Sequence, residues 1–383
     1  MRIPLKYNVR NLLRRKTRSS LTAAGIMLVV VVNVFMFSFA RGMLLMVKSS
    51  GSPDNIIVLD RKGKTCLFSE LKSPDFNLLR TMPEIKKTAT GEVMVSPELV
   101  VQALIQSGDY KNRPGVVRGI TPIAYDVTEK IQITEGRKPA EAFEIAAGEL
   151  AHANIGIPAS GLEVGKKIEF EDESWTVVGR FSTGGTVLDG QLLANLADIQ
   201  AVLNRHTYSA AVLKLQNPAS MAPVVADLNA RNDIQVQAIS EIDYYKDYAK
   251  GFGRIIFLAI TMAVICALGG LVGGMNTMYS SVFGRVREVA TLQVLGFGKK
   301  DVILSFIVES LMLAIIGGIA GCLLGLLADS LAIKLAMGAF DIHVDWLTFG
   351  GGMLVAVVIG IIGALPPVIR ATRMPVTDAL RYN

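Results

Sequence analysis

Four long runs without a charged residue divide the chain. They contain 22, 30, 19 and 24 residues and lie between Arg18 and Arg41, between Arg254 and Arg285, between Glu309 and Asp329, and between Asp345 and Arg370. A helix needs about 20 apolar residues to cross about 30 Å of hydrocarbon. The pattern therefore predicts four transmembrane helices, at residues 20–42, 253–279, 303–328 and 347–369.

The composition agrees with a membrane protein. Of the 383 residues, 51% are apolar and only 19% are charged, whereas soluble domains carry about 25% charged residues. These figures exclude intrinsic disorder. Three cysteines in so long a chain also exclude a disulfide scaffold, and Cys266 and Cys322 lie inside apolar runs, which leaves Cys66 without a local partner.

The distribution of charge predicts the topology. Residues 42–250 contain 22 Lys and Arg against 26 Asp and Glu, whereas the rest of the chain contains 17 against 7. Basic residues gather in cytoplasmic connections, and here they are Arg2, Lys6, Arg10, Arg14, Arg15, Lys16 and Arg18 before the first run, Arg285, Arg287, Lys299 and Lys300 after the second, and Arg370, Arg373 and Arg381 after the fourth.

Both termini are therefore expected in the cytoplasm. The cytoplasmic parts are then residues 1–19, 280–302 and 370–383, and the outside parts are a large domain and stalk at 43–250 and a loop at 329–346. That loop carries Asp329, Asp341 and Asp345 with only Lys334. A cleaved signal peptide is the competing interpretation of the first run, but Leu21–Ala40 is longer than a signal peptide's 7–15 apolar residues and no Ala-x-Ala site follows it.

The outside segment reads as an α+β domain. Runs rich in β-branched and aromatic residues, separated by Gly, Asp and Pro, predict strands at Asn55–Leu59, Leu99–Ile105, Lys167–Phe170, Trp175–Phe181 and Ala210–Leu215. Apolar residues at i, i+3 and i+4 predict helices at Leu192–Leu203 and Ser220–Asn229, with Pro218 in the turn before the second. Residues 241–250 are expected to continue as a helical stalk into the second membrane helix.

Catalytic and metal-binding chemistry has little support in the sequence. The histidines at 152, 206 and 343 lie far apart with no HExxH or Cys/His companion, so no metal site is expected. The segment GLEVGKK at residues 161–167 has three residues between its glycines where a phosphate loop has four, and it lacks the following Ser or Thr. It is expected to be a turn. The acidic residues Glu169, Glu171, Asp172 and Glu173 lack EF-hand spacing and indicate a solvated hairpin tip.

Small residues recur at four-residue spacing in two membrane helices. Gly317, Gly321 and Gly325 share one face of the third helix, and Gly270 and Gly274 repeat the spacing in the second. Such spacing lets helix backbones approach closely, so these five glycines are predicted to make helix contacts. Glu309 is the acid nearest to the hydrocarbon. A proton relay is the competing interpretation of this residue, but a snorkelling or capping role at the interface is preferred.

The segment at residues 276–311, NTMYSSVFGRVREVATLQVLGFGKKDVILSFIVESL, resembles the signature of the MacB/FtsX-like permeases, the membrane subunits of a class of ABC transporter. The residues at the family's positions are Asn276, Arg285, Arg287, Glu288, Leu295 and Gly296. Gln293 departs from the family, which usually has an Arg there. The chain's two ends and the segments GELA, GLEVGKKIEF and WTVVGRF are also similar to the family.

This resemblance implies a permease without catalytic activity or a cofactor of its own. It implies a separate ATPase subunit that holds ATP and Mg, a second permease copy or related permease, and a cytoplasmic coupling helix at about Phe283–Val294. Arg285, Arg287 and Glu288 would be exposed there for charge-assisted contacts with the ATPase, beside Leu295 and Gly296.

Two functions are compatible with the resemblance. The first is export or extraction of a lipoprotein, lipid, peptide or drug across a bacterial inner membrane, in which ATP-driven motion is transmitted to the outside domain, with an adaptor or substrate protein bound there. The alternative is an FtsX-like scaffold that regulates a cell-wall hydrolase without transport. A nucleic-acid partner is not expected, because the basic residues are those that set the topology.

Overall fold

The computed structural model describes residues 10, 12, 14, 16–329, 331–334, 339–375 and 379. The chain forms two compact units. We call Met1–Arg41, Arg254–Ser330 and Ile342–Asn383 the helical unit, and Gly42–Gly253 with Leu331–Asp341 the α+β unit. Predictions that involve Arg2, Lys6, Arg15 and Arg381 lie outside the described residues.

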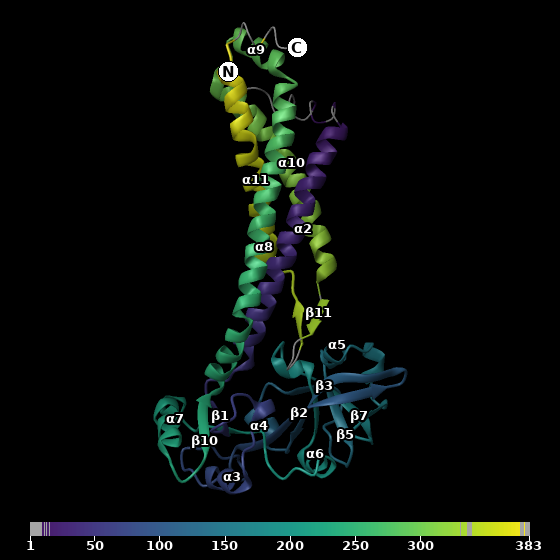
Figure 1. Ribbon diagram of the computed structural model, residues 1–383, viewed down its shortest axis with the longest axis vertical. Coiled ribbons are helices and arrows are strands. Elements are labelled where there is room, and N and C mark those ends of the chain that lie inside the picture. The colour runs from purple at the N-terminus through teal and green to yellow at the C-terminus, as the bar shows by residue number, and fades with distance from the viewer. Residues whose placement is uncertain are drawn as a thin grey trace. The chain divides into compact units, whose positions relative to one another are not determined.

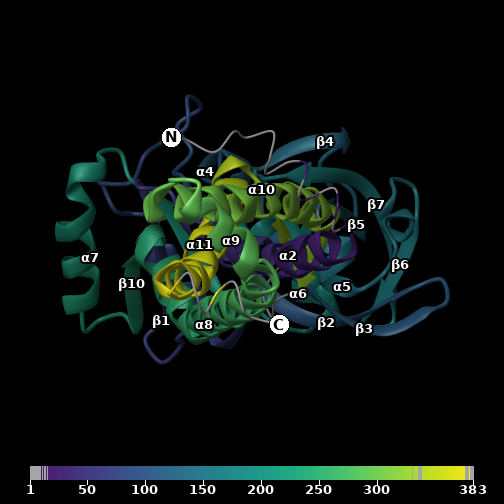
Figure 2. The same cartoon turned by 90° about the horizontal axis from the view of Figure 1, so that it is seen from above.

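Four helices in the described part of the chain are long and apolar enough to cross a membrane. They are α2 (Lys16–Ser50), α8 (Glu241–Phe283), α10 (Lys299–Gly325) followed by the short helix η5 (Leu326–Ala328), and α11 (Trp346–Arg373). Figures 1 and 2 show them side by side. The predicted fold class is confirmed, since each predicted span lies within one of these segments.

All four helices extend beyond the predicted spans, and α8 and α2 do so by the most residues. The helix α8 begins at Glu241, which confirms that residues 241–250 continue into the second membrane helix. The helix α2 ends at Ser50, eight residues past the predicted limit at 42. Residues 43–47, near its end, are all apolar and contain no residue that favours a turn. The hydropathy pattern therefore could not locate the end of the helix.

The α+β unit is built on one sheet of ten strands. Its order is β10-β1-β9-β2-β3-β8-β5-β7-β4, and β6 pairs with both β2 and β7. The strands are β1 (Asn55–Asp60), β2 (Val95–Ser107), β3 (Tyr110–Ile120), β4 (Gln132–Gly136), β5 (Glu144–Gly148), β6 (Lys167–Phe170), β7 (Glu173–Ser182), β8 (Leu192–Asn195), β9 (Ala210–Lys214) and β10 (Val236–Ser240).

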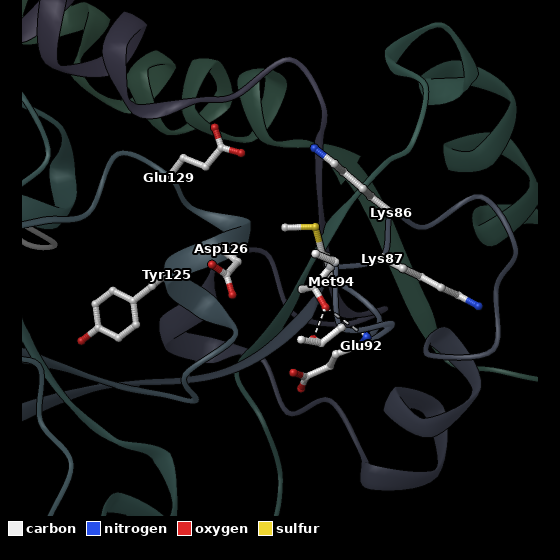
Figure 3. Close-up of a pocket in the computed structure, with 10 residues that line it drawn as sticks. Lys86, Lys87, Glu92, Met94, Tyr125, Asp126 and Glu129 are labelled. Carbon is white, nitrogen blue, oxygen red and sulfur yellow. Dashed lines mark hydrogen bonds between the residues drawn. The ribbon is translucent and has the colours of Figure 1, made fainter.

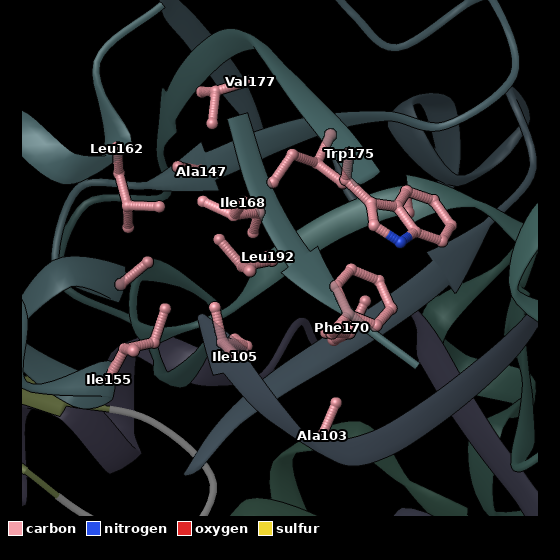
Figure 4. Close-up of a cluster of buried hydrophobic side chains, with 14 of the residues drawn as sticks. Ala103, Ile105, Ala147, Ile155, Leu162, Ile168, Phe170, Trp175, Val177 and Leu192 are labelled. Atoms are coloured by element: carbon pink, nitrogen blue, oxygen red, sulfur yellow. The ribbon is translucent and has the colours of Figure 1, made fainter. Parts of the chain in front are cut away.

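Short helices complete the α+β unit and its core. They are α3 (Ser73–Leu79), α4 (Ala124–Val127), α5 (Ala151–Ile155), α6 (Leu196–Val202) and α7 (Met221–Ala230). One buried cluster joins β1, β9 and β10 to α3 and α7. A second, drawn in Figure 4, joins β2, β3 and β5–β8 to α5 and α6, and in it Trp175 stacks on Phe170 with ring centroids 4.4 Å apart.

All five predicted strands are confirmed, but one predicted helix is half wrong. Leu192–Leu203 divides into the strand β8 and the helix α6, because the Asn195 side chain accepts a hydrogen bond from the Ala197 N–H (3.1 Å) and starts the helix there. Buried on both faces, β8 has the continuous apolar pattern that spacing alone does not distinguish from a helix. The acidic segment is indeed the tip of the β6–β7 hairpin, where Glu171 and Asp172 both have positive φ.

The predicted loop at 329–346 contains a second sheet. The strands β11 (Leu331–Lys334) and β12 (Ala339–Ile342) pair with each other, and all but the last residue of β12 belongs to the α+β unit. There the Lys334 Nζ donates to the Pro114 carbonyl oxygen (3.3 Å). A Cβ at Gly42 would lie 2.9 Å from the Asp341 carbonyl oxygen, so only glycine fits that contact between α2 and β12.

Candidate functional site

A short amphipathic helix lies between the second and third membrane helices. The helix α9 spans Val286–Val294 and is preceded by a turn at residues 284–285. Val286, Val289 and Ala290 are buried on one side, at the i, i+3, i+4 spacing of a packed helix. Arg287 and Glu288 are exposed on the other side. The predicted coupling helix is thus a real helix in the structure, beginning three residues later than predicted.

The first predicted coupling residue, Arg285, is not exposed. Only 4% of its surface is accessible, it forms an ion pair with Glu309 of α10, and its guanidinium group lies 5.2 Å from the centre of the Phe306 ring. The prediction that Arg285 is exposed for contacts with a partner is therefore wrong. The interfacial capping or snorkelling role preferred for Glu309 is wrong too, because its side chain is 7% exposed and paired with Arg285.

The ion pair has a simple physical reason. A lone charge on either side chain would be costly at a buried position, whereas two opposite charges in contact compensate each other. The sequence contained a signal for it: Glu309 is an acid beside a long apolar run, and such a residue usually faces the interior of a helix bundle and pairs with a basic group. Spacing did not identify the partner, which lies 24 residues away.

Two further polar contacts fix the neighbouring segments. The Gln293 side-chain amide donates to the Thr372 carbonyl oxygen of α11 (3.3 Å), so the residue that replaces the family's Arg still links α9 to another helix. Arg18 of α2 donates to the carbonyl oxygen (3.0 Å) and hydroxyl group (2.9 Å) of Ser280 in α8. The predicted site residues Leu295 and Gly296 lie at the end of α9; Leu295 is 66% exposed, and Gly296 has a φ of 91°, which favours glycine.

The five predicted packing glycines lie against other helices of the helical unit. A Cβ at Gly317 would lie 2.6 Å from the Ala23 carbonyl oxygen, and one at Gly321 would lie 2.7 Å from the Met27 carbonyl oxygen. The corresponding closest atoms are side-chain carbons of Val34 at Gly325, of Val29 at Gly270 and of Ile359 at Gly274, at 2.8, 2.6 and 3.2 Å. Three of the glycines thus allow α10 to approach α2.

The described residues include no group of three His, Cys, Asp or Glu side chains that could hold a metal ion. The α+β unit has a hollow of about 540 Å³, lined by the segment at 86–94 and by Tyr125, Asp126 and Glu129 (Figure 3). Its lysines, Lys86 and Lys87, point in different directions in that view. The hollow is open and more polar than apolar, whereas typical ligand sites are enclosed and mostly apolar.

Fold and site together define a membrane protein of four spans, with an α+β domain after the first span and an amphipathic helix after the second. A model described as MacB-like periplasmic core domain matches residues 19–231, and one described as FtsX-like permease C-terminal matches residues 260–376. The first match covers more than half of the chain. The chain belongs to the MacB/FtsX-like family of ABC transporter permeases.

Individual relatives agree with this assignment. The chain is 30% identical over 167 residues to an uncharacterised ABC transporter permease, YknZ of Bacillus subtilis, covering 42% of this chain and 40% of YknZ. It is 24% identical over 396 residues to a macrolide export ATP-binding/permease protein, MacB of Acinetobacter baylyi, covering 95% of this chain and 57% of that protein. The chain thus spans about half the length of these curated relatives.

Two solved structures resemble part of the chain. The periplasmic region of MacB from Actinobacillus actinomycetemcomitans matches with a TM-score of 0.40 and 15% identity, covering 54% of this chain and 97% of that structure. The extracellular domain of YknZ matches with a TM-score of 0.35 and 13% identity, covering 49% of this chain and 100% of that domain.

Proposed function

We propose that this permease transmits ATP-driven motion from an ABC ATPase to its α+β unit, and that it serves the export or extraction of a lipoprotein, lipid, peptide or drug. In this proposal the ATPase is a separate chain that holds ATP and Mg, and the permease works as a dimer with a second copy or a related permease. Both termini and α9 face the cytoplasm of a bacterial cell, and the α+β unit faces outward.

The observation that carries the proposal is the division of α9 into two faces. Its buried face packs on the helical unit through Val286, Val289 and Ala290, and the ion pair between Arg285 and Glu309 ties its first turn to α10. A force applied to the exposed face would therefore move α10 with it, because interfaces and packed cores transmit displacement as units rather than deforming continuously. Glu288 on that exposed face supplies a charge for a basic partner surface.

The relatives support an ATPase partner. The name of the Acinetobacter baylyi relative includes both ATP-binding and permease functions, and we propose that the same two activities meet in a complex here. Apolar side chains of α8 such as Phe257, Leu258 and Val272 are exposed in the single chain. In the proposal they contact lipid or the second permease.

A charge reversal at Glu288 tests the proposed interface. In a complex reconstituted with its ATPase, Glu288→Lys is expected to lower permease-stimulated ATP hydrolysis at least about tenfold, since like charges then face each other. Folding is expected to be unchanged, because an exposed side chain contributes within about 0.5 kcal/mol. The matched control is Glu163→Lys, which makes the same change at an exposed turn of the α+β unit. Normal stimulation by the Glu288 variant would refute the interface.

Purification from native membranes tests the partners themselves. The full chain, extracted in mild detergent, is expected to bring down an ATPase with a Walker motif. Recovery of a cell-wall hydrolase on the α+β unit, with no change in transport when the permease is deleted, would favour a regulatory scaffold instead. Recovery of no ATPase under several gentle conditions would contradict the proposal.

A further inference from the structure

A buried carboxyl group lies in the α+β unit where two long helices meet the sheet. Glu241 is the first residue of α8 and is 5% exposed. Its Oε2 accepts hydrogen bonds from the Ser52 backbone N–H (3.0 Å) and from the Asn55 Nδ2 (3.0 Å). Ser52 lies two residues after the end of α2, and Asn55 is the first residue of β1. One side chain thus connects α2, α8 and the sheet.

Backbone packing reinforces this connection. A Cβ at Gly51 would lie 2.7 Å from the Ile242 Cα, so the chain leaving α2 and the chain entering α8 are in direct contact. The strand β10, which leads directly into α8, is paired with β1 from Ile56 to Asp60. Both helices therefore meet the sheet at β1, which neighbours β10 on one side and β9 on the other.

The end of α2 has its own contacts. The Lys130 Nζ donates to the carbonyl oxygens of Ser49 (2.5 Å) and Gly51 (3.0 Å), which would otherwise be left over at the helix end. The Ser50 hydroxyl oxygen accepts from the N–H of Val187 (3.0 Å), the first residue of the short helix η3 (Val187–Gly190) before β8. These contacts hold α2 alone. The contacts of Glu241 differ from these in two ways. They join the start of α8 to the segment that follows α2, and they are made by a side chain that can change its charge.

The surroundings of Glu241 make its charge state depend on pH near neutrality. Burial raises the pKa of its carboxyl group to about 7, the hydrogen bonds from Ser52 and Asn55 lower it, and the charges of Glu98 on β2 and Lys130 after α4 act in opposite directions. Tyr245, one turn along α8, faces the same group, and its own pKa is raised by burial and by Glu241. Glu98 is itself paired with Arg118.

We infer that Glu241 is a positioning residue, a latch that fastens the end of α2 and the start of α8 to β1 so that the two helices and the sheet move together. Its part in transmitting motion rests on the proposed function; the latch itself does not. Opening the latch would expose the carboxyl group to water, where its pKa returns to the ordinary value of 4.5. The closed latch binds a proton more tightly than the open one, so opening becomes easier as pH rises from about 4.5 to about 7.

Hydrogen exchange measured by mass spectrometry on the full chain in lipid nanodiscs tests the latch without an ATPase. The peptides to follow cover residues 46–58 and 238–246, and a peptide over the β6–β7 hairpin serves as an internal reference. At pH 5, Glu241→Ala is expected to exchange at least about tenfold faster than the wild type in both junction peptides. The reason is that the Ser52 N–H and the Asn55 Nδ2 lose their buried acceptor. The hairpin is expected to keep its protection.

The pH profile separates a latch from a merely structural contact. After correction for intrinsic rates, the wild-type junction is expected to lose protection between pH 5 and pH 8. Glu241→Gln keeps an acceptor oxygen but does not titrate, so its protection is expected to stay constant. Asp243→Asn is the matched control, because Asp243 lies in the same turn of α8 but is exposed, and it is expected to retain the wild-type decline.

Two results would overturn the inference. One is an unchanged junction in Glu241→Ala, and the other is a wild-type decline with pH that persists in Glu241→Gln. If Glu241→Ala exposes the whole α+β unit, the comparison of Glu241→Gln with the wild type decides alone. Because no ATPase is present, failure of the proposed coupling would leave these results unaffected, so the two failures are distinguishable.

Discussion

The interior of each unit is held together by a different kind of contact. The α+β unit buries large apolar side chains, such as Trp175 and Phe181, between its sheet and short helices. The helical unit brings backbones close at glycines and contains the buried ion pair of Arg285 with Glu309. Removing apolar surface from water stabilises the first unit. In the second, lipid is as apolar as the side chains, so close packing and polar contacts must supply helix association.

The largest effect is expected when one partner of the buried ion pair is removed. Arg285→Ala leaves the Glu309 carboxylate buried and uncompensated, which should cost about 3–5 kcal/mol. The measurement is the thermal stability of the full chain in nanodiscs. The control is the double variant Arg285→Met with Glu309→Leu, which removes both charges and should recover most of the stability. Equal losses in the single and double variants would show that packing, and not charge, holds α9 to α10.

In the α+β unit the corresponding test is a substitution that creates a cavity in the apolar core. Ile168 on β6 is fully buried in the cluster of Figure 4, and Ile168→Ala should cost about 2–5 kcal/mol in lost transfer energy and an unfilled cavity. Its neighbour Glu169 points to the opposite, exposed side of the strand. Glu169→Ala should therefore change stability by no more than about 0.5 kcal/mol. Similar losses for the two variants would contradict the register of β6.

Replacing glycine by alanine should have opposite effects on stability at two positions of the helical unit. Gly321→Ala brings a methyl group within 2.7 Å of the Met27 carbonyl oxygen, and forcing the helices apart should cost about 1–3 kcal/mol. Gly273 in α8 has no atom within 4 Å of where its Cβ would lie. Gly273→Ala should instead gain up to about 1 kcal/mol from higher helix propensity. Stability of the full chain measures both, and losses of equal size would show that helix packing does not distinguish the two positions.

The contrast between the units also explains what the sequence could predict. The four membrane helices follow from long uncharged runs, a one-dimensional property that needs no knowledge of contacts. Strands such as β6 and β7 are marked by local alternation of apolar and polar residues, and β6 was predicted with its observed ends. The continuous burial of β8 and the apolar end of α2 carry no such local signal, so their boundaries were missed.

The candidate site was predictable only in part. The exposed positions of Arg287 and Glu288 followed from the resemblance of one segment, but the burial of Arg285 depends on Glu309, a residue on another helix. The same holds for Glu241, which acts on Ser52 and Asn55 from nearly 190 residues away. Contacts between distant segments decide whether a charged residue serves a partner or the fold, and no spacing within a single segment contains that information.

An ion pair in the α+β unit that is open to water offers a comparison with the buried pair. Arg137 and Glu144 form a pair in the α+β unit, but the Arg137 side chain is 50% exposed, compared with 4% for Arg285. Glu144 also accepts hydrogen bonds from the backbone N–H groups of Ala140 and Glu141, both at 3.0 Å. The Arg137 side chain, followed by these backbone donors, holds the pKa of Glu144 at about 2, against the opposing effect of burial.

The smallest change in stability is therefore expected when acid protonates Glu144. Because the pKa of Glu144 is lower in the folded chain than its ordinary 4.5, its stabilising contribution is fully present above about pH 4.5 and is lost as pH falls toward about 2. Glu144→Gln should reduce this part of the acid sensitivity, measured as thermal stability at steps between pH 5 and pH 3. Glu141→Gln, an exposed change in the same turn, should retain it. Equal acid sensitivity in wild type and Glu144→Gln would mean that the ion pair with the half-exposed Arg137 contributes little to stability, in contrast with a pair shielded from water such as Arg285 with Glu309.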